Sequence, residues 1–306
     1  MSARANFSIY VFAIASLAMA GAGSVKAQSP SWAIPHGVKT IVANGYPIAY
    51  QETGSGAPVV LVHGSLSDYR TWSLQVPELA KTNRTFAISL RHYYPEKWNG
   101  EGDDFSITQH AHDVAAFIRA LQLGKAHVLG HGRGGAVALN VAHHHPDTVR
   151  SLILMDASGL ESLLPKAPEG RKMASEGMEL RENLKRNLAA GDLEKAGREF
   201  IDALSAPGNW AKLNAGLKQM YLDNMGTGVV VEGRPKLSCT DIGKFNFPIF
   251  LVHGEKSPKR YQEMFSAMRD CGKMPEPVVI PQAGLSMHTQ NPEAFNRVIR
   301  DFLARH

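Results

Sequence analysis

The stretch VLGHGRGGAVAL, residues 128–139, constrains the fold of this chain more than any other segment. An apolar run ends at Gly130, small residues follow, and a second apolar run of helical character begins at about Gly134. This pattern predicts a buried strand, a sharp turn and a helix. Gly132 stands at the centre of the turn. Glycine adopts a positive φ without strain, so it suits such a turn, but it brings no side chain to it.

Short apolar runs recur along the chain and are continuous rather than alternating, which is typical of strands covered on both faces. A hairpin is predicted ahead of them, because Asn44-Gly45 favours a type I′ turn. With helical segments between several runs, the sequence predicts an α/β fold with a mostly parallel central sheet and crossover helices. The expected strands cover residues 58–64, 85–90, 126–130, 151–156, 248–254 and 277–280, and the expected helices 106–121, 134–145 and 291–306.

Between Asp156 and about Lys244 the strand signals stop and the sequence becomes charged and helical. In GDLEKAGREFIDAL, residues 191–204, apolar residues fall on one helix face and Asp192 is placed to cap the helix. We expect a helical insertion over residues 157–244 that forms a lid over the carboxyl edge of the sheet. The core of the fold is then divided between residues 28–156 and 245–306.

The first 27 residues have the pattern of an export signal, with Arg4, an apolar stretch and the A-x-A-like cleavage site Val25-Lys26-Ala27. The apolar stretch is shorter than the roughly 20 residues of a membrane span. We therefore predict a signal peptide over residues 1–27 and a secreted or periplasmic product with no stable membrane anchor after cleavage. In an oxidising compartment Cys239 and Cys271 are able to pair, and the alternative is two separate buried thiols.

The formal net charge of +5 comes from basic residues that are interleaved with acidic ones. This distribution is typical of a solvated surface, so no nucleic-acid partner is expected.

Four segments carry a family resemblance: LVHGS (61–65), GHGRGG (130–135), FLVHGEKSP (250–258) and PQAGLSMHTQNPEAFNRVIRDFL (281–303). With the strands and helices around them they resemble the α/β-hydrolase family over nearly all of the chain after the signal. In that order they are similar to its oxyanion loop, its nucleophile elbow, the strand and loop of its acid, and its histidine loop and last helix. The resemblance implies the α/β-hydrolase fold with an inserted helical lid, and a cofactor-independent hydrolysis of an ester, lactone or carbon-carbon bond.

All three positions of the implied Ser-Asp-His triad carry other residues. Gly132 stands at the nucleophile position, Ser257 at the acid position and Leu285 at the histidine position. A serine hydroxyl carries no charge to stabilise an imidazolium, and His288, the second histidine of the motif, is displaced by three residues. Asp156, at the end of the preceding strand, matches a place where some members carry their acid and is the candidate surrogate.

The backbone amides of Ser65 and Arg133 occupy positions that resemble the oxyanion hole. The sequence therefore predicts a secreted α/β-hydrolase-fold protein that is inactive or severely impaired in acyl-enzyme chemistry but still binds a small carbonyl or ester ligand, without a cofactor. One alternative is an active hydrolase or lyase that uses Asp156, His131 or His288. A partner-binding module is the other.

Several further residues have simple interpretations. Neither the AHHHPD segment (142–147) nor the pair His110 and His112 has the spacing that places ligands on one helix face, so no metal site is predicted. His63 is similar to the family's usual neighbour of the oxyanion loop. Four aromatic residues either line a ligand pocket or pack in the core: Trp72, Tyr93, Tyr94 and Trp98.

Overall fold

The structure is a computed structural model that describes residues 30–164, 168–205, 207–230, 236–272 and 274–306, so the predicted signal peptide lies outside the described residues. One eight-stranded sheet has the order β1-β2-β4-β3-β5-β6-β7-β8. The pairs β1-β2 and β2-β4 are antiparallel and the others are parallel, which confirms the predicted mostly parallel sheet. The strands are β1 (Lys39–Ala43), β2 (Tyr46–Thr53), β3 (Ala57–Val62), β4 (Asn83–Ile88), β5 (Ala126–His131), β6 (Val149–Met155), β7 (Ile249–Gly254) and β8 (Val278–Ile280).

The turn between β1 and β2 has the predicted geometry. Asn44 has a φ of 52° and Gly45 a φ of 73°, and a type I′ turn requires positive values at both positions. Residues 43 and 46 face each other across the hairpin, so the two-residue loop sets the register of this edge of the sheet.

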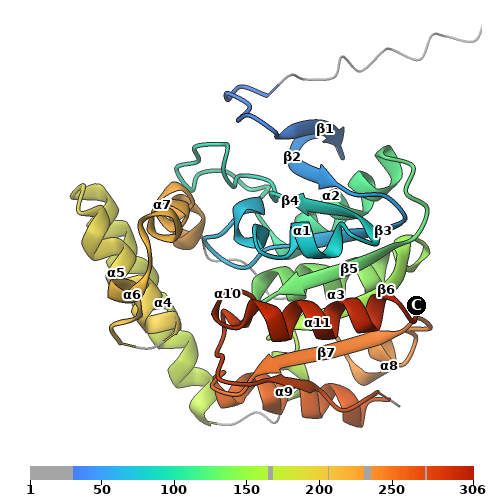
Figure 1. Ribbon diagram of the computed structural model, residues 1–306. Helices are drawn as coiled ribbons and strands as arrows, with labels where there is room; N and C mark the ends of the chain where they lie inside the picture. Colours follow the sequence, from blue (N-terminus) through green and yellow to red (C-terminus); the bar gives the residue numbers. More distant parts are fainter. Residues whose placement is uncertain (1–29, 165–167, 206, 231–235, 273) are drawn as a thin grey trace, which may run out of the picture.

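Helices cover both faces of the sheet (Figure 1). Val60 and Val62 of β3 pack in the core on one face, whereas Val59 and Leu61 pack on the other, so the strand is buried on both sides as its continuous apolar run predicts. The first face is covered by α2 (Ile107–Ala120), α3 (Arg133–His144) and α9 (Lys259–Asp270), and the second by η1 (Tyr69–Trp72), α1 (Val76–Leu79), α10 (Met287–Gln290) and α11 (Pro292–Leu303).

The chain between β6 and β7 is helical, as the sequence indicates. Asp192 caps α5 by accepting a hydrogen bond from the amide of Lys195 at 3.1 Å. Figure 1 shows α4 to α7 on the side toward which the arrows of β5 and β7 point, beyond the carboxyl ends of the strands. The role of this insertion as a lid stays a prediction. The remaining elements are η2 (Pro146–Thr148), η3 (Glu161–Leu163), α4 (Pro168–Ala189), α5 (Leu193–Leu204), α6 (Asn209–Lys212), α7 (Ala215–Asp223), η4 (Met225–Val229) and α8 (Cys239–Ile242).

The insertion packs against the body of the protein through Leu66, which follows the HGS segment and is fully buried. Around it gathers a separate apolar cluster from the insertion: Leu184, Ala196, Phe200, Ile201, Trp210 and Met225. The loop after β3 therefore contributes both to the carboxyl end of the sheet and to the apolar core of the insertion.

Cys239 and Cys271 form a disulfide, with Cα atoms 4.7 Å apart, so the alternative of two separate thiols is wrong. The bond joins the start of α8, which precedes β7, to the residue after α9, which follows β7. In the chain-entropy view, closing a loop of this length stabilises the fold by about 3 to 4 kcal/mol.

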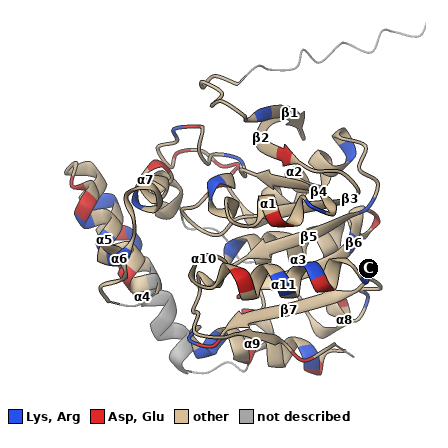
Figure 2. Cartoon of the chain, in the orientation of Figure 1, with Lys and Arg blue, Asp and Glu red and all other residues tan. Residues whose placement is uncertain are grey.

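Basic and acidic residues are interspersed along the same elements, as Figure 2 shows for α5 and α11. Among the described residues, no helix has the length and hydropathy needed to cross a membrane.

Candidate functional site

The turn that contains Gly132 has the predicted strand–turn–helix form. β5 ends at His131, Gly132 has a φ of 52° and a ψ of −115°, and α3 begins at Arg133. The amide of Gly132 donates to the carbonyl of Met155 at 3.0 Å, and its own carbonyl accepts from the amide of Ser158 at 3.0 Å. These bonds hold the turn against the end of β6.

Gly132 differs from the glycines around it in what a side chain would meet. A Cβ atom added to Gly130, Gly134 or Gly135 would lie 2.3 to 2.4 Å from neighbouring atoms, so the packing demands glycine there. A Cβ added to Gly132 would meet nothing within 4 Å. The turn thus has room for a side chain at the one position where the resemblance places a nucleophile.

The loop after β3 brings a backbone amide to the same end of the sheet. Ser65 is exposed, and its amide donates to no atom of the described residues. The loop around it is fixed: Ser67 Oγ donates to the carbonyl of Gly64 at 3.1 Å, and Nε2 of the fully buried His63 accepts from the amide of Leu90 at 3.0 Å. Burial lowers the pKa of His63 to about 3, so this imidazole is neutral and structural.

The structure brings Asp156 and Ser257 together. Asp156 follows β6 and Ser257 follows β7, and the Ser257 hydroxyl donates to Oδ2 of Asp156 at 2.5 Å. Ser257 Oγ also accepts from the amide of Gly254 at 3.1 Å. The two alternative acid positions that the sequence suggests are therefore neighbours, because parallel adjacent strands end at the same edge of the sheet.

The Asp156 side chain is fully buried. Burial raises its pKa to about 7, although the hydrogen bonds from Ser257 and the Gly254 amide favour the charged form. Oδ1 of Asp156 has no hydrogen-bond partner among the described residues. With a pKa near 7, the Asp156 carboxyl changes its charge near neutral pH. Perturbed pKa values of this kind occur in catalytic acids and also in buried structural carboxyls.

Leu285 lies half-buried, packed against the large core cluster. His288 is buried too: its Nε2 lies 2.9 Å from Thr71 Oγ1, and its carbonyl accepts from Gln75. The ring of His131 lies 5.2 Å from the ring of His288. Burial lowers the pKa of both imidazoles, that of His131 to about 4, so both are neutral at physiological pH.

A polar cluster that sequence reasoning missed ties the insertion to the loop after Ser65. Asp68 is fully buried and accepts from Arg70 Nη2 at 2.6 Å and from Asn224 Nδ2 at 2.7 Å. Arg70 also pairs with Asp223 at 2.8 Å and lies 3.7 Å above the ring of Tyr94. The one sequence signal for this cluster is the capping pattern at Asp68.

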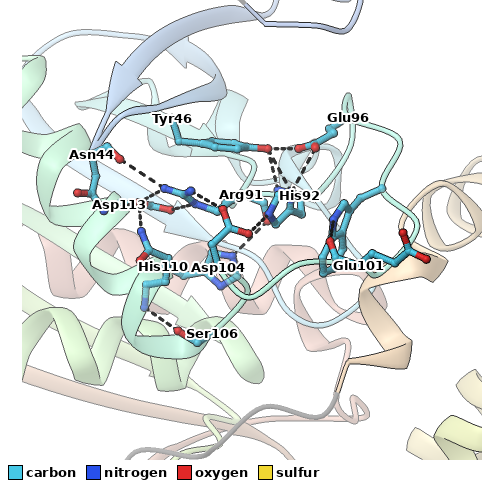
Figure 3. A network of polar contacts seen from close by, with 12 residues as sticks. Asn44, Tyr46, Arg91, His92, Glu96, Glu101, Asp104, Ser106, His110 and Asp113 are labelled. Carbon is cyan, nitrogen blue, oxygen red and sulfur yellow. Dashed lines mark hydrogen bonds and ion pairs between the residues drawn. The ribbon is translucent and has the colours of Figure 1, made fainter. Parts of the chain in front are cut away.

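A second missed network holds the loop after β4 (Figure 3). Arg91 makes two 2.9 Å bonds to Asp113 and one of 2.7 Å to Asp104, which in turn contacts His92 Nε2 at 2.7 Å. Glu96 contacts His92 Nδ1 at 3.2 Å, and burial raises the pKa of Glu96 to about 7. The network fixes the loop that leads into α2.

The four predicted pocket aromatics are mostly engaged in packing. Trp72 is fully buried and Tyr93 is 3 % exposed. Trp98 stacks on His92 at 4.3 Å, while Tyr94 lies under the guanidinium of Arg70.

The candidate metal residues bind protein groups. His110 is fully buried, with Nε2 3.2 Å from the carbonyl of Arg91, and His112 Nδ1 lies 2.7 Å from His145 Nε2. Within the described part of the chain, no three His, Cys, Asp or Glu residues are arranged to hold a metal ion.

Three features of this fold define the α/β-hydrolase class. The sheet is mostly parallel, a sharp turn lined by glycines joins a strand to a helix, and further helices are inserted before the penultimate strand. The sequence matches the alpha/beta hydrolase family over residues 59–298, and the chain belongs to this family.

The relatives are enzymes of several kinds. A 2-hydroxymuconate semialdehyde hydrolase from Pseudomonas sp. strain CF600 is 30% identical over 130 residues, 40% of this chain and 44% of that protein. The matches to the first three curated relatives span less than half the length of each of those proteins. A putative 2-succinyl-6-hydroxy-2,4-cyclohexadiene-1-carboxylate synthase from Bacillus subtilis is 24% identical, over 87% of this chain and 98% of that one.

Among solved structures, a thermophilic esterase from Thermogutta terrifontis with bound malate has a TM-score of 0.70 at 24% identity, covering 88% of this chain and 98% of its own. At this identity the likeness supports the fold alone.

We predict that the single change Gly132→Ser lowers the melting temperature slightly. The added side chain has room, but a positive φ strains any residue with a Cβ by about 1 kcal/mol or more. Thermal unfolding of the protein and the variant, with Gly132→Ala as the control for the Cβ alone, measures this. An unchanged or higher melting temperature would contradict the strain argument.

Proposed function

We propose that the protein is an exported member of the α/β-hydrolase family that lacks the Ser-Asp-His triad and is inactive or severely impaired as an acyl-transfer enzyme. In this proposal it binds a small carbonyl or ester ligand at the amides of Ser65 and Arg133, beneath the helical insertion. The observation that carries this proposal is the elbow itself. Gly132 lies at the start of α3 in a turn with open space and no attacking atom.

The neighbouring groups support the same proposal. At the implied acid position Ser257 offers a hydroxyl, and the implied histidine position holds Leu285. An oxyanion hole and substrate binding without a triad leave roughly 10³ to 10⁴ of the rate enhancement over water, whereas losing the triad costs on the order of 10⁶ in kcat. Binding at the two amides is thus the function that this arrangement favours.

The Cys239–Cys271 disulfide supports export, because such bonds persist in oxidising compartments. One solved neighbour is a meta-cleavage product hydrolase from Pseudomonas fluorescens, a serine-to-alanine mutant complexed with acetates. Its TM-score is 0.63 at 19% identity, covering 87% of this chain and 97% of its own. Small carboxylates and their esters are therefore reasonable probes of the site proposed here.

The proposal predicts that hydrolysis of bound p-nitrophenyl butyrate exceeds the buffer rate by no more than the roughly 10³- to 10⁴-fold that remains without a triad, and that the protein binds ethyl butyrate. Saturation-transfer NMR detects the binding. Ser65→Pro removes one amide donor and is expected to weaken the signal, whereas Ser65→Ala removes only the hydroxyl and is expected to leave it unchanged. Circular dichroism checks that both variants fold. Fast turnover that disappears in Asp156→Asn would overturn the proposal in favour of a hydrolase or lyase that acts through Asp156.

A further inference from the structure

A groove of about 610 Å³ lies at the opposite end of the sheet from Gly132. It is formed where β7 and β8 begin, whereas Gly132 follows the carboxyl end of the parallel strand β5. In Figure 1 the chain end marked C lies at this end, away from α4 to α7. The groove is thus separated from the elbow by the length of the strands, roughly 15 to 20 Å.

The walls of the groove are mostly apolar, and four of the lining residues are phenylalanines. Phe250 and Phe302 stack with ring centroids 4.8 Å apart, and Phe245 and Phe247 stack at 5.4 Å. Val278 of the edge strand β8 adds an aliphatic surface to the groove. Ligand pockets in proteins have this size and this kind of lining, with a small number of polar groups that fix the orientation of the ligand.

The disulfide joins two of these walls. Ile242 and Gly243, at the end of α8, line one side, and Gly272, directly after Cys271, lines another. Because the Cys239–Cys271 bond connects the two segments covalently, the groove does not have to be assembled by a ligand.

The charge available at the rim is positive. Arg305 lines the groove, and its Nε donates to the carbonyl of Asp301 at 2.8 Å, but its guanidinium makes no ion pair with any described residue. The carboxylate of Glu276, the acidic lining residue, is in contact with Arg269. An anionic group on a ligand therefore has an available partner in Arg305, whose fork of N–H donors suits a carboxylate.

We propose that this groove is a second binding site, which takes an aromatic carboxylate with its ring against the half-buried Phe245 and Phe247 and its carboxylate on Arg305. The site is independent of the amides at the elbow and does not depend on the function proposed for them. Its specificity has two parts: the apolar walls select a flat ring, and the guanidinium selects the acid over an uncharged analogue.

The test compares two probes of similar shape, 1-naphthoate and 1-naphthalenemethanol, by isothermal titration of the disulfide-bonded protein. We expect one site for 1-naphthoate with an affinity about three- to tenfold higher than for the alcohol, as one solvent-accessible charge-assisted contact gives. Arg305→Gln is expected to abolish this preference. The matched control is Arg297→Gln, an exposed arginine of α11 that does not line the groove, and it is expected to keep the preference.

A second variant tests the walls. Phe247→Ala shortens a half-buried lining side chain and is expected to weaken both probes alike, without changing the preference for the acid. Gly132→Ser, at the other end of the sheet, is expected to change neither affinity. The proposal is overturned if 1-naphthoate does not bind, if Arg305→Gln behaves like Arg297→Gln, or if Gly132→Ser removes the binding.

Discussion

A variant with Gly132→Ser and Leu285→His is expected to hydrolyse p-nitrophenyl butyrate at least about a thousandfold faster than the parent chain. The elbow has room for the serine side chain, and the amide of Ser65 is available for the oxyanion. A complete triad contributes on the order of 10⁶ in kcat, so even an imperfectly placed one produces visible turnover. Initial rates at saturating ester measure the gain, and Gly132→Ala with Leu285→His, which lacks the nucleophile, is the control.

This design leaves Ser257 in place because the structure already supplies a carboxyl there. Asp156 contacts Ser257 Oγ at 2.5 Å, so it lies within the space of the implied acid position. Adding Ser257→Asp would set two buried carboxyls side by side, and such a pair shares one proton and carries about one charge. We therefore expect the double variant and the triple variant with Ser257→Asp to be similarly active near pH 7.

Asp156→Asn separates the two acids. In the double variant it is expected to reduce kcat by more than about a hundredfold, because the imidazolium then has no carboxylate partner. In the triple variant the carboxyl introduced by Ser257→Asp takes over, so Asp156→Asn is expected to have a small effect there. A double variant that is silent beside an active triple variant would show that Asp156 does not serve as the acid. If both were silent, the residues at the three implied triad positions would not by themselves explain the lack of activity.

In the parent chain, Asp156→Asn is expected to change how stability depends on pH. The folded pKa of Asp156 is raised to about 7 from an ordinary value of 3.8, so the folded state binds the proton more tightly than the unfolded chain. The stabilisation from this proton is fully present below about pH 4 and is lost as the pH rises toward and through 7, by about 1.4 kcal/mol per unit. Asparagine has no such proton to lose.

Urea unfolding of the parent and Asp156→Asn at pH 5 and pH 8 measures this difference. We expect the variant to gain about 2 to 3 kcal/mol relative to the parent on going from pH 5 to pH 8. The other titrating groups are common to both proteins and cancel in the comparison. The exposed Asp103, changed to Asn, is the control and should show no comparable gain. A constant difference between parent and Asp156→Asn at the two pH values would mean that Asp156 is ionised in the folded state throughout.

The elements that follow from local patterns were predictable. The continuous apolar runs predicted the strands, and Asn44-Gly45 predicted the hairpin. The small residues around Gly132 predicted the turn between β5 and α3. These features depend on the preferences of neighbouring residues, so the order of the chain carries the information. Helix α9 was not predicted, although its buried residues have helical spacing, because polar residues separate them.

The contacts that give the candidate site its chemistry join residues far apart in the chain. Asp156 and Ser257 are 101 positions apart, and Asp68 and Asn224 are 156 apart. The sequence suggested both Asp156 and Ser257 as acid positions, but only the pairing of β6 with β7 brought them into one hydrogen bond. Burial of that pair then set the pKa of Asp156.

By itself, then, the sequence determined the α/β-hydrolase architecture, the place of the elbow and the identities of the residues at the three implied triad positions. Tertiary structure decided that the two cysteines are bonded, that Gly132 has open space beside it while its glycine neighbours do not, and that an aromatic groove with Arg305 at its rim lies at the far end of the sheet. The reason is physical: a local preference acts between adjacent residues, whereas burial, free space and charge pairing arise only when distant segments are packed together.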